Sequence, residues 1–202
     1  MRDNYQYIDP DSTYTDPITG LLRNKSNIDN SQLLVAFESM KCSERLEELA
    51  KIPIKIKDST ALLAIHKFLF QDVYEWAGLK RTVEISKEGK PFFPIAYFDK
   101  GFTYIDSLIT EYRKIDPVEK NILANHLANL LDSINYLHPF REGNGRTQRE
   151  FLRILALEKG YTLNLNPPDN VVVYERYMSG TIEGDVDKLT GLIEELLEKT
   201  NK

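Results

Sequence analysis

Cysteine is almost absent from this chain, and so are long hydrophobic runs. Cys42 is the single cysteine among 202 residues, which excludes an intramolecular disulfide and fits a reducing compartment. No apolar run approaches the roughly 20 residues of a membrane-spanning helix. No basic-then-apolar leader opens the chain either. We therefore expect a cytoplasmic protein, with secretion by a route that needs no N-terminal signal left open.

An excess of positive charge is also lacking. The 26 basic and 31 acidic residues give a formal net charge of −5, which argues against binding to nucleic acid or to an anionic membrane surface. A chain of 202 residues with 42% hydrophobic content suffices for one domain with a substantial core. Local clusters of arginine in such an acidic chain indicate a small anionic ligand instead.

The stretch 138–149, which reads HPFREGNGRTQR, concentrates most of the chemically interesting side chains. Apolar residues at helical spacing precede and follow it, so we predict a loop between two buried helices. Pro139 should end the first helix at His138 and leave the imidazole at its rim. The two glycines around Asn144 permit positive φ or a close approach to a ligand. Backbone N–H groups in such a turn, at the start of a helix, predict an anion site.

Arginines follow the turn at positions that share one helix face. Arg146, Arg149 and Arg153 stand at i, i+3 and i+7. Cations at a helix N-terminus oppose its dipole and repel one another, whereas a polyanionic ligand turns this into a gain because guanidinium groups bind phosphate bidentately. We predict phosphate binding for Arg146 and Arg149. For Arg153, an ion pair with Glu150 on a solvated face is the simpler interpretation.

The remaining motif residues complete a transfer site. Glu142 places a carboxylate among these cations, as Mg²⁺ beside phosphates requires. His138, with an unperturbed pKa of about 6.5, can act as a general base near neutral pH. Base, metal ligand, anion site and arginines are what nucleotidyl or phosphoryl transfer needs. A Walker lysine is lacking, and Gln148 stands where GxGxxG needs its third glycine, which excludes the P-loop and Rossmann motifs.

These residues resemble the signature of the Fic domain family, H-P-F-x-(D/E)-G-N-G-R-x-x-R, and every specified position is matched. A second stretch, 69–78 followed by Arg81 and 85–87, resembles the upstream half of that fold. The resemblance implies a mainly α protein: a bundle of about eight helices with a β-hairpin flap over the active site. It also implies transfer of AMP from ATP to a hydroxyl side chain of a target protein. The phosphotransferase branch, Doc, usually has lysine where Gly145 stands, so we expect AMP transfer.

The resemblance also implies a role for each motif residue. Glu142 would hold Mg²⁺ between the α- and β-phosphates, and Arg149 would orient the γ-phosphate. His138 would take the proton of the target hydroxyl as it attacks the α-phosphorus and pyrophosphate leaves. The diphosphate would be neutralised by Arg146 with the backbone N–H groups of Gly143, Asn144 and Gly145.

Residues 81–96 break the helical pattern. Alternation over 81–86, turn residues over 87–91 and an extended run after them predict a β-hairpin, which must lie on the helical body because an isolated hairpin is marginally stable. In Fic proteins the corresponding hairpin is a flap that holds the target segment by strand addition. Lys87, at the end of the run 85–87, can approach the nucleotide, although a solvated lysine is the simpler interpretation.

The rest of the chain reads as helices around this site. Residues 1–30 are rich in turn residues and tyrosine and should pack as an extension on a Fic domain of residues 31–202. His66 lies in a helical segment without a second metal ligand nearby, so we expect a packed or capping histidine. Periodicity predicts helices over 31–51, 60–76, 99–114, 117–137 and 145–159, a short helical segment from 167 through 177, and a final amphipathic helix over 189–197.

Regulation and target are open at this stage. The segment 179–184, SGTIEG, matches the family's inhibitory pattern S/T-x-x-x-E-G/N, whose glutamate pairs with the arginine at Arg149. The pattern is short, its glycines make a poor helix, and it leads directly into the final helix. We therefore expect inhibition by a separate small antitoxin, in keeping with the small size of toxin-type Fic proteins. Such toxins modify the ATPase subunits of DNA gyrase and topoisomerase IV, which makes these subunits candidate targets by analogy.

Three other functions compete with AMP transfer to a protein. A Fic-type enzyme can use another nucleotide or a phosphate group, or remove AMP from a modified protein, because the base pocket lies outside the motif. A non-catalytic nucleotide-binding module is the third. Intact His138 and Glu142 weigh against this last function, since a pure binder needs no base.

Overall fold

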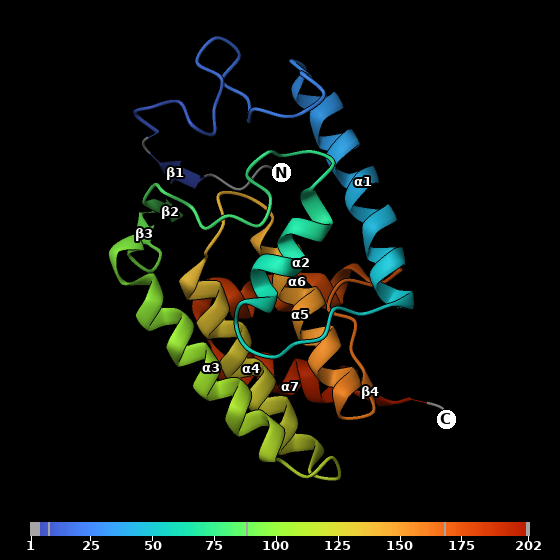
Figure 1. The fold of residues 1–202 in the computed structure, drawn as a ribbon. Helices are drawn as coiled ribbons and strands as arrows, with labels where there is room; N and C mark the ends of the chain where they lie inside the picture. The colour runs from blue at the N-terminus through green and yellow to red at the C-terminus, as the bar shows by residue number, and fades with distance from the viewer. Residues whose placement is uncertain (1–4, 8, 88, 168, 201–202) are drawn as a thin grey trace.

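The computed structural model describes residues 5–7, 9–87, 89–167 and 169–200. The first four residues and residue 8 of the predicted extension, residues 88 and 168, and the last two residues fall outside this description. Figure 1 shows a mainly helical molecule in which α3 and α4 form a long pair and α1 stands at the opposite edge. The described helices are α1 (Ser31–Lys51), α2 (Ala61–Phe70), α3 (Phe98–Lys114), α4 (Lys120–Leu137), α5 (Asn144–Glu158), α6 (Val171–Glu183) and α7 (Val186–Leu196).

The predicted fold class is confirmed: these residues form a helical bundle with a small antiparallel hairpin. The described part of the chain holds seven α-helices and one 3-10 turn (Ile95–Tyr97), close to the expected eight. The core centres on α4, which packs against α3 on one side and α7 on another, and contacts α5. Leu127, Leu130 and Leu131 are fully buried there. Burying one such side chain stabilises a fold by about 1.5–3 kcal/mol. These contacts hold α4 in place, so the end of α4 determines where the motif 138–149 begins.

Two predicted helix limits before α5 were wrong, and the short segment predicted from 167 through 177 lies later in the chain, as α6. The helix predicted over 60–76 ends at Phe70, because the next residues fold into turns that bring Tyr74 and Trp76 into a stack with ring centroids 4.2 Å apart. The helix predicted from 117 begins at Lys120. The Asp116 carboxylate accepts the Val118 N–H at 2.9 Å and makes a turn there instead.

The C-terminal helices also correct one expectation. Residues 179–183 are helical, as the last part of α6, although they contain Gly180. A Cβ at Gly180 would lie 2.6 Å from Leu189 Cδ2, so the glycine allows α6 and α7 to pack closely. Gly184 ends α6 at φ 67°, and α7 follows directly as predicted. A short pair of strands, β4 (Tyr161–Thr162) and β5 (Glu198–Lys199), ties the end of the chain to the segment after α5.

The predicted flap is part of a three-stranded antiparallel sheet. Its hairpin consists of β2 (Ile85–Lys87) and β3 (Lys90–Pro91), and β1 (Tyr5–Tyr7) pairs with the other edge of β2. The following segment, residues 9–30, lies against the helical body. Its Tyr14 hydroxyl accepts the Thr82 N–H at 3.0 Å, and the Tyr14 ring meets Trp76 edge to face. The N-terminal strand and residues 9–30 are thus attached to the base of the flap.

Candidate active site

The turn between α4 and α5 forms the floor of the site. His138 is the C-cap of α4 with φ 43° and ψ 60°, a left-handed conformation that is uncommon for residues other than glycine. Gly143 is the N-cap of α5 with φ 81°. Between them, the Asn144 side chain accepts the Phe140 N–H at 3.0 Å and donates to the Phe140 carbonyl at 2.8 Å. The Asn144 side chain therefore closes the loop, and only its backbone is left for the predicted anion site.

His138 is more enclosed than the sequence indicated. Its exposed fraction is 4%, because Phe92 of the flap stacks on the imidazole with ring centroids 3.8 Å apart. The expectation of an imidazole at the rim is therefore wrong. Nδ1 lies 3.1 Å from the Asn135 carbonyl oxygen, which can only accept, so the Nδ1–H tautomer is selected and Nε2 carries the lone pair. Burial lowers the pKa of His138 to about 3, and the Asn135 bond opposes this shift.

Gly143 and the first turn of α5 approach a buried aromatic side chain. A Cβ at Gly143 would lie 2.4 Å from the Phe70 ring, so both the close packing and the positive φ require glycine here. The prediction of positive φ for the turn holds at Gly143. Gly145 instead has helical geometry inside α5 and lies beside Arg149. The N–H groups at the start of α5 have no partners one turn earlier in the helix, and this end of a helix attracts anions.

Arg146 is held by a residue that the sequence did not indicate. Its guanidinium donates to Glu38 of α1 and lies over the Phe70 ring, 4.7 Å from the centroid. The other Glu38 oxygen accepts the Tyr74 hydroxyl. Burial and the Glu38 carboxylate raise the pKa of Tyr74, so the hydroxyl stays protonated and donates. Glu38 thus holds the Arg146 guanidinium in position. Nothing in the local sequence of α1 distinguishes it from the other acidic residues there.

Glu142 directly precedes the N-terminus of α5, which is the positive end of that helix's dipole. Its Oε1 accepts the Gly143 N–H at 2.9 Å and is 3.8 Å from Arg146 Nη2. Burial and then the nearby Glu38 carboxylate raise its pKa, which indicates a carboxylate that a cation would stabilise. No group of three or more metal-ligating side chains occurs among residues that the structure describes. A single carboxylate fits Mg²⁺ only where phosphate oxygens and water supply the remaining ligands.

The other two arginines behave differently from each other. Arg149 lies over the rings of Tyr174 and Tyr177 of α6, at 5.6 and 5.4 Å. Arg153 donates through Nε and Nη2 to the two Glu150 oxygens, each at 2.7 Å, which confirms the predicted ion pair. The expectation of a solvated face is wrong, because the Glu150 side chain is buried. Arg146 and Arg149, but not Arg153, line the cavity described next.

The predicted site residues come together around one cavity of about 510 Å³. Lys87, Lys90 and Phe92 of the flap segment line one side, and α6 lines the other with its tyrosines and its end at Glu183. On the floor lie His138, Glu142, Gly143, Asn144, Gly145, Arg146 and Arg149. The lining of the whole cavity, which includes Lys87, contains every residue that the sequence assigned to the site. A ligand of nucleotide size that fills this cavity would contact the flap, the turn between α4 and α5, and α6.

Two residues that support the turn had signals in the sequence. His66 is fully buried, as expected of a packed histidine. Its Nδ1 accepts the Gly78 N–H at 2.8 Å, so its Nε2–H donates to the Glu142 carbonyl at 2.9 Å. Arg81 belongs to the upstream stretch of the family resemblance, but its role was not foreseen: it donates to the His138 carbonyl at 2.9 Å. Both hold backbone groups of the motif from outside it.

Several known proteins are similar to this chain in sequence or in structure. The model of the Fic/DOC family matches residues 57–156. The protein adenylyltransferase VbhT of Bartonella schoenbuchensis is 36% identical over 79% of this chain, which spans 34% of that protein. The probable protein adenylyltransferase y4lH of Sinorhizobium fredii is 35% identical over 73% of this chain and 77% of its own length. The BepC protein of Bartonella tribocorum, solved with bound AMPPNP, is 21% identical and superposes with a TM-score of 0.82 over 94% of this chain and 98% of that one.

Proposed function

This chain belongs to the Fic/DOC family, and we propose that it is a protein adenylyltransferase that transfers AMP from ATP to a hydroxyl side chain of a target protein. The observation that carries the proposal is the convergence of His138, Glu142, Arg146 and Arg149 on one cavity under the flap. The names of VbhT and y4lH, and the AMPPNP bound to BepC, support the same reaction.

The α4–α5 turn would bind the phosphates. N–H groups at the start of α5 and the guanidinium of Arg146 would neutralise the diphosphate. Arg149, on the side of α6, would orient the γ-phosphate. These groups are fixed before the substrate arrives, Arg146 by Glu38 and the turn by Asn144 and His66, so little reorganisation accompanies binding.

His138 would act through Nε2, since Nδ1 is engaged with the Asn135 carbonyl. The target hydroxyl gives its proton to Nε2 while its oxygen bonds to the α-phosphorus. The bond between the α-phosphorus and the bridging oxygen breaks, and pyrophosphate leaves. A pKa of about 3 is low for a base, but the negative charge of bound phosphates would raise it.

Glu142 would hold Mg²⁺. Its raised pKa and its position beside the anion site fit a carboxylate that completes a cation's coordination with phosphate oxygens. When bound, Mg²⁺ supplies charge neutralisation for the phosphates. Glu38 is engaged with Arg146 and Tyr74 and is left out of this assignment.

A target segment would reach the site by pairing with the flap as a strand. Lys87 and Lys90 line the cavity from the hairpin. Lys87 would approach the nucleotide phosphates from that side. These two lysines would also disfavour basic side chains next to the acceptor hydroxyl.

Labelled ATP tests the reaction directly. Incubation of the protein with a cell lysate and α-labelled ATP should label a protein band, and γ-labelled ATP should leave it unlabelled. Label from the γ-phosphate alone would assign phosphotransfer instead. Mass spectrometry of AMP-modified peptides would then identify the target and the acceptor residue.

The chain would act in the cytoplasm as the toxin of a toxin–antitoxin pair, with a small antitoxin supplying an inhibitory glutamate to Arg149. The internal match at 179–184 is a weaker source. Glu183 accepts from the Ser179 hydroxyl at 2.6 Å and pairs with Lys188. Its carboxylate is thus engaged on the surface of α6 and the start of α7. Among the described helices, none is long and apolar enough to cross a membrane.

The source of inhibition can be tested by substitution and co-expression. Glu183→Gly should change AMP transfer less than about twofold, because Glu183 is half exposed and pairs locally. Glu183→Gln serves as the control that keeps the helix. Co-expression with a neighbouring small open reading frame should silence the enzyme. Strong activation by Glu183→Gly in the isolated protein would place the switch within the chain.

The ATPase subunits of gyrase and topoisomerase IV are proposed targets by family analogy alone. Expression of the chain should then arrest growth and leave AMP on those subunits. Normal growth with unmodified gyrase would reject this target while leaving the transfer reaction to the lysate assay.

A further inference from the structure

Arg81 is the first residue of the flap segment 81–96, and its side chain is 0% exposed. Nε donates to the His138 carbonyl at 2.9 Å, Nη1 to the Val83 carbonyl at 2.7 Å and Nη2 to the Phe93 carbonyl at 2.6 Å. Val83 precedes the hairpin and Phe93 follows it. One guanidinium therefore binds both ends of the flap and the backbone of the proposed base.

This arrangement buries a cation with little compensating charge. Burial lowers the pKa of Arg81. Its carboxylate neighbour, Glu84, is 3.3 Å from Nη1 but 58% exposed. Burying a charge without a well-placed counterion is unfavourable, so simple packing would be served better by an apolar side chain. The rigid fork of guanidinium donors, however, can bind three separately placed carbonyl groups at once.

The carbonyl that Arg81 binds belongs to a strained residue. A left-handed conformation at a residue other than glycine is strained and persists only where its surroundings hold it. The His138 N–H donates to the Ile134 carbonyl at 3.0 Å, its own carbonyl accepts from Arg81, and its ring lies under Phe92. Phe92 directly precedes Phe93, whose carbonyl Arg81 also binds. Movement of the flap base would therefore shift the ring above the imidazole.

We propose that Arg81 is a positioning residue that couples the flap to His138. It holds the backbone carbonyl of His138 and, through the Phe93 carbonyl, the position of the neighbouring Phe92 ring. The position of the flap and the orientation of the imidazole therefore depend on each other. This inference rests on the proposed function, in which His138 is the base and the flap receives the target.

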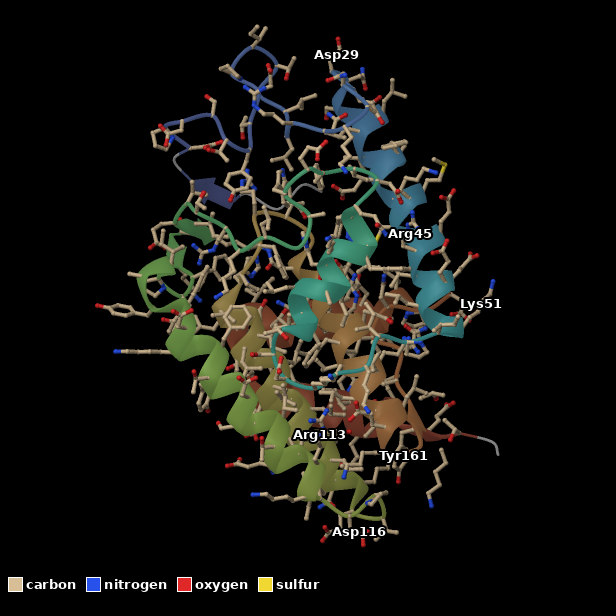
Figure 2. All side chains as sticks on the ribbon, in the orientation of Figure 1. Asp29, Arg45, Lys51, Arg113, Asp116 and Tyr161 are labelled. Atoms are coloured by element: carbon tan, nitrogen blue, oxygen red, sulfur yellow. The ribbon has the colours of Figure 1, made fainter. Side chains whose placement is uncertain are left out.

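Arg81→Lys tests the coupling, because lysine keeps the charge but cannot bind three carbonyl groups. Arg113→Lys is the matched control. Arg113 also donates to two carbonyls, those of Ile56 and Lys57, but near the far end of α3 from the flap (Figure 2). With a lysate target and α-labelled ATP, Arg81→Lys should lower kcat by about 10- to 100-fold, as expected for a misplaced catalytic group. The KM for ATP should stay within about twofold in both variants, because the phosphate-binding groups are untouched.

A second readout needs no activity. The chain has three histidines, so the ¹⁵N and ¹H resonances of each imidazole can be assigned by NMR. The wild-type spectrum should show His138 as the Nδ1–H tautomer. Arg81→Lys should shift the His138 resonances and leave those of His66 in place, and Arg113→Lys should shift neither. If the wild type transfers no AMP, the proposed function fails, whereas this spectrum still decides the coupling.

The proposal is overturned if folded Arg81→Lys protein keeps the wild-type kcat and the wild-type His138 resonances. Should Arg81→Lys fail to fold, Arg81→Gln replaces it, because glutamine buries no charge and its amide cannot bind three separate carbonyl groups at once. A reduced kcat and shifted His138 resonances are expected here as well. Wild-type values for both in folded Arg81→Gln would overturn the proposal.

Discussion

The imidazole of His138 is held by groups from three separate parts of the chain. Asn135, one turn earlier in α4, accepts from Nδ1, Phe92 covers the ring, and Arg81 binds the carbonyl. Arg146 is held in the same way by Glu38 of α1. The proposed reactive side chains come from the motif, but their orientation depends on residues outside it. Substitutions at motif positions should therefore affect stability as well as chemistry.

Replacing His138 by alanine should abolish AMP transfer, with a loss of about 10²- to 10⁴-fold for the missing base. It should also lower the melting temperature, because the buried ring under Phe92 is removed. His138→Asn is the control. Asparagine tolerates the left-handed conformation better and can donate to the Asn135 carbonyl, so it should restore part of the stability and none of the activity. Full activity in either variant would remove His138 from the reaction.

Replacing Glu142 by glutamine should weaken the use of ATP at low Mg²⁺. The amide keeps the shape and can still accept the Gly143 N–H, but it lacks the charge that holds a divalent cation. Activity measured over a Mg²⁺ titration should recover partly at high concentration. An unchanged Mg²⁺ dependence would mean that the metal is held elsewhere.

At the level of elements, the flap has one edge that suits strand addition, and β1 occupies it. The Phe92 N–H donates to the Ile85 carbonyl at 3.1 Å, so the backbone groups of Ser86 face away from β3 and toward β1. On the outer side of β3, Pro91 has no N–H to offer. A target strand that pairs with β2 would therefore have to displace β1.

Gln6→Pro should relieve this competition. Gln6 pairs with Ser86 in the centre of β1, and proline removes a ladder donor there. The apparent KM for a protein target should fall, while the KM for ATP stays constant. Gln6→Thr, which suits a strand, should behave like the wild type. A raised KM for the target with Gln6→Pro would instead show that β1 supports the flap.

For the whole molecule, two buried histidines make the fold sensitive to acid. Burial lowers the pKa of both His66 and His138 to about 3. The unfolded chain binds a proton at each near pH 6.5. Below that pH the unfolded state binds more protons than the folded state, so stability is lost as pH falls from about 6.5 toward 3. His66 donates to the Glu142 carbonyl, so part of this loss of stability concerns the turn that carries the candidate site.

Urea unfolding at pH 7.5 and pH 5.0 tests this dependence. At pH 5.0 each histidine should contribute about 2 kcal/mol less to the free energy of unfolding, at 1.36 kcal/mol per pH unit below 6.5. His66→Gln should therefore show a loss between the two pH values that is smaller by about 2 kcal/mol. An equal loss in the variant and the wild type would show that His66 accepts a proton in the folded state.

The sequence alone determined the class of fold and predicted the residues that line the candidate site. Helical periodicity set most helices to within a few residues, and the turn 138–149 brought base, carboxylate, glycines and arginines together, because all lie within twelve residues. Where local chemistry decided the outcome, as for the helix end before Pro139 and the Arg153–Glu150 pair, the sequence prediction was right.

Contacts between distant segments were decided only by the tertiary structure. The burial of His138 depends on Phe92, about 46 residues away, and the position of the Arg146 guanidinium depends on Glu38, more than 100 residues away. The end of α2 at Phe70 depends on aromatic packing that overrides helix propensity. The pairing of β1 with the flap carries almost no signal in three residues. Periodicity reports only near neighbours, so such contacts appear once the helices pack.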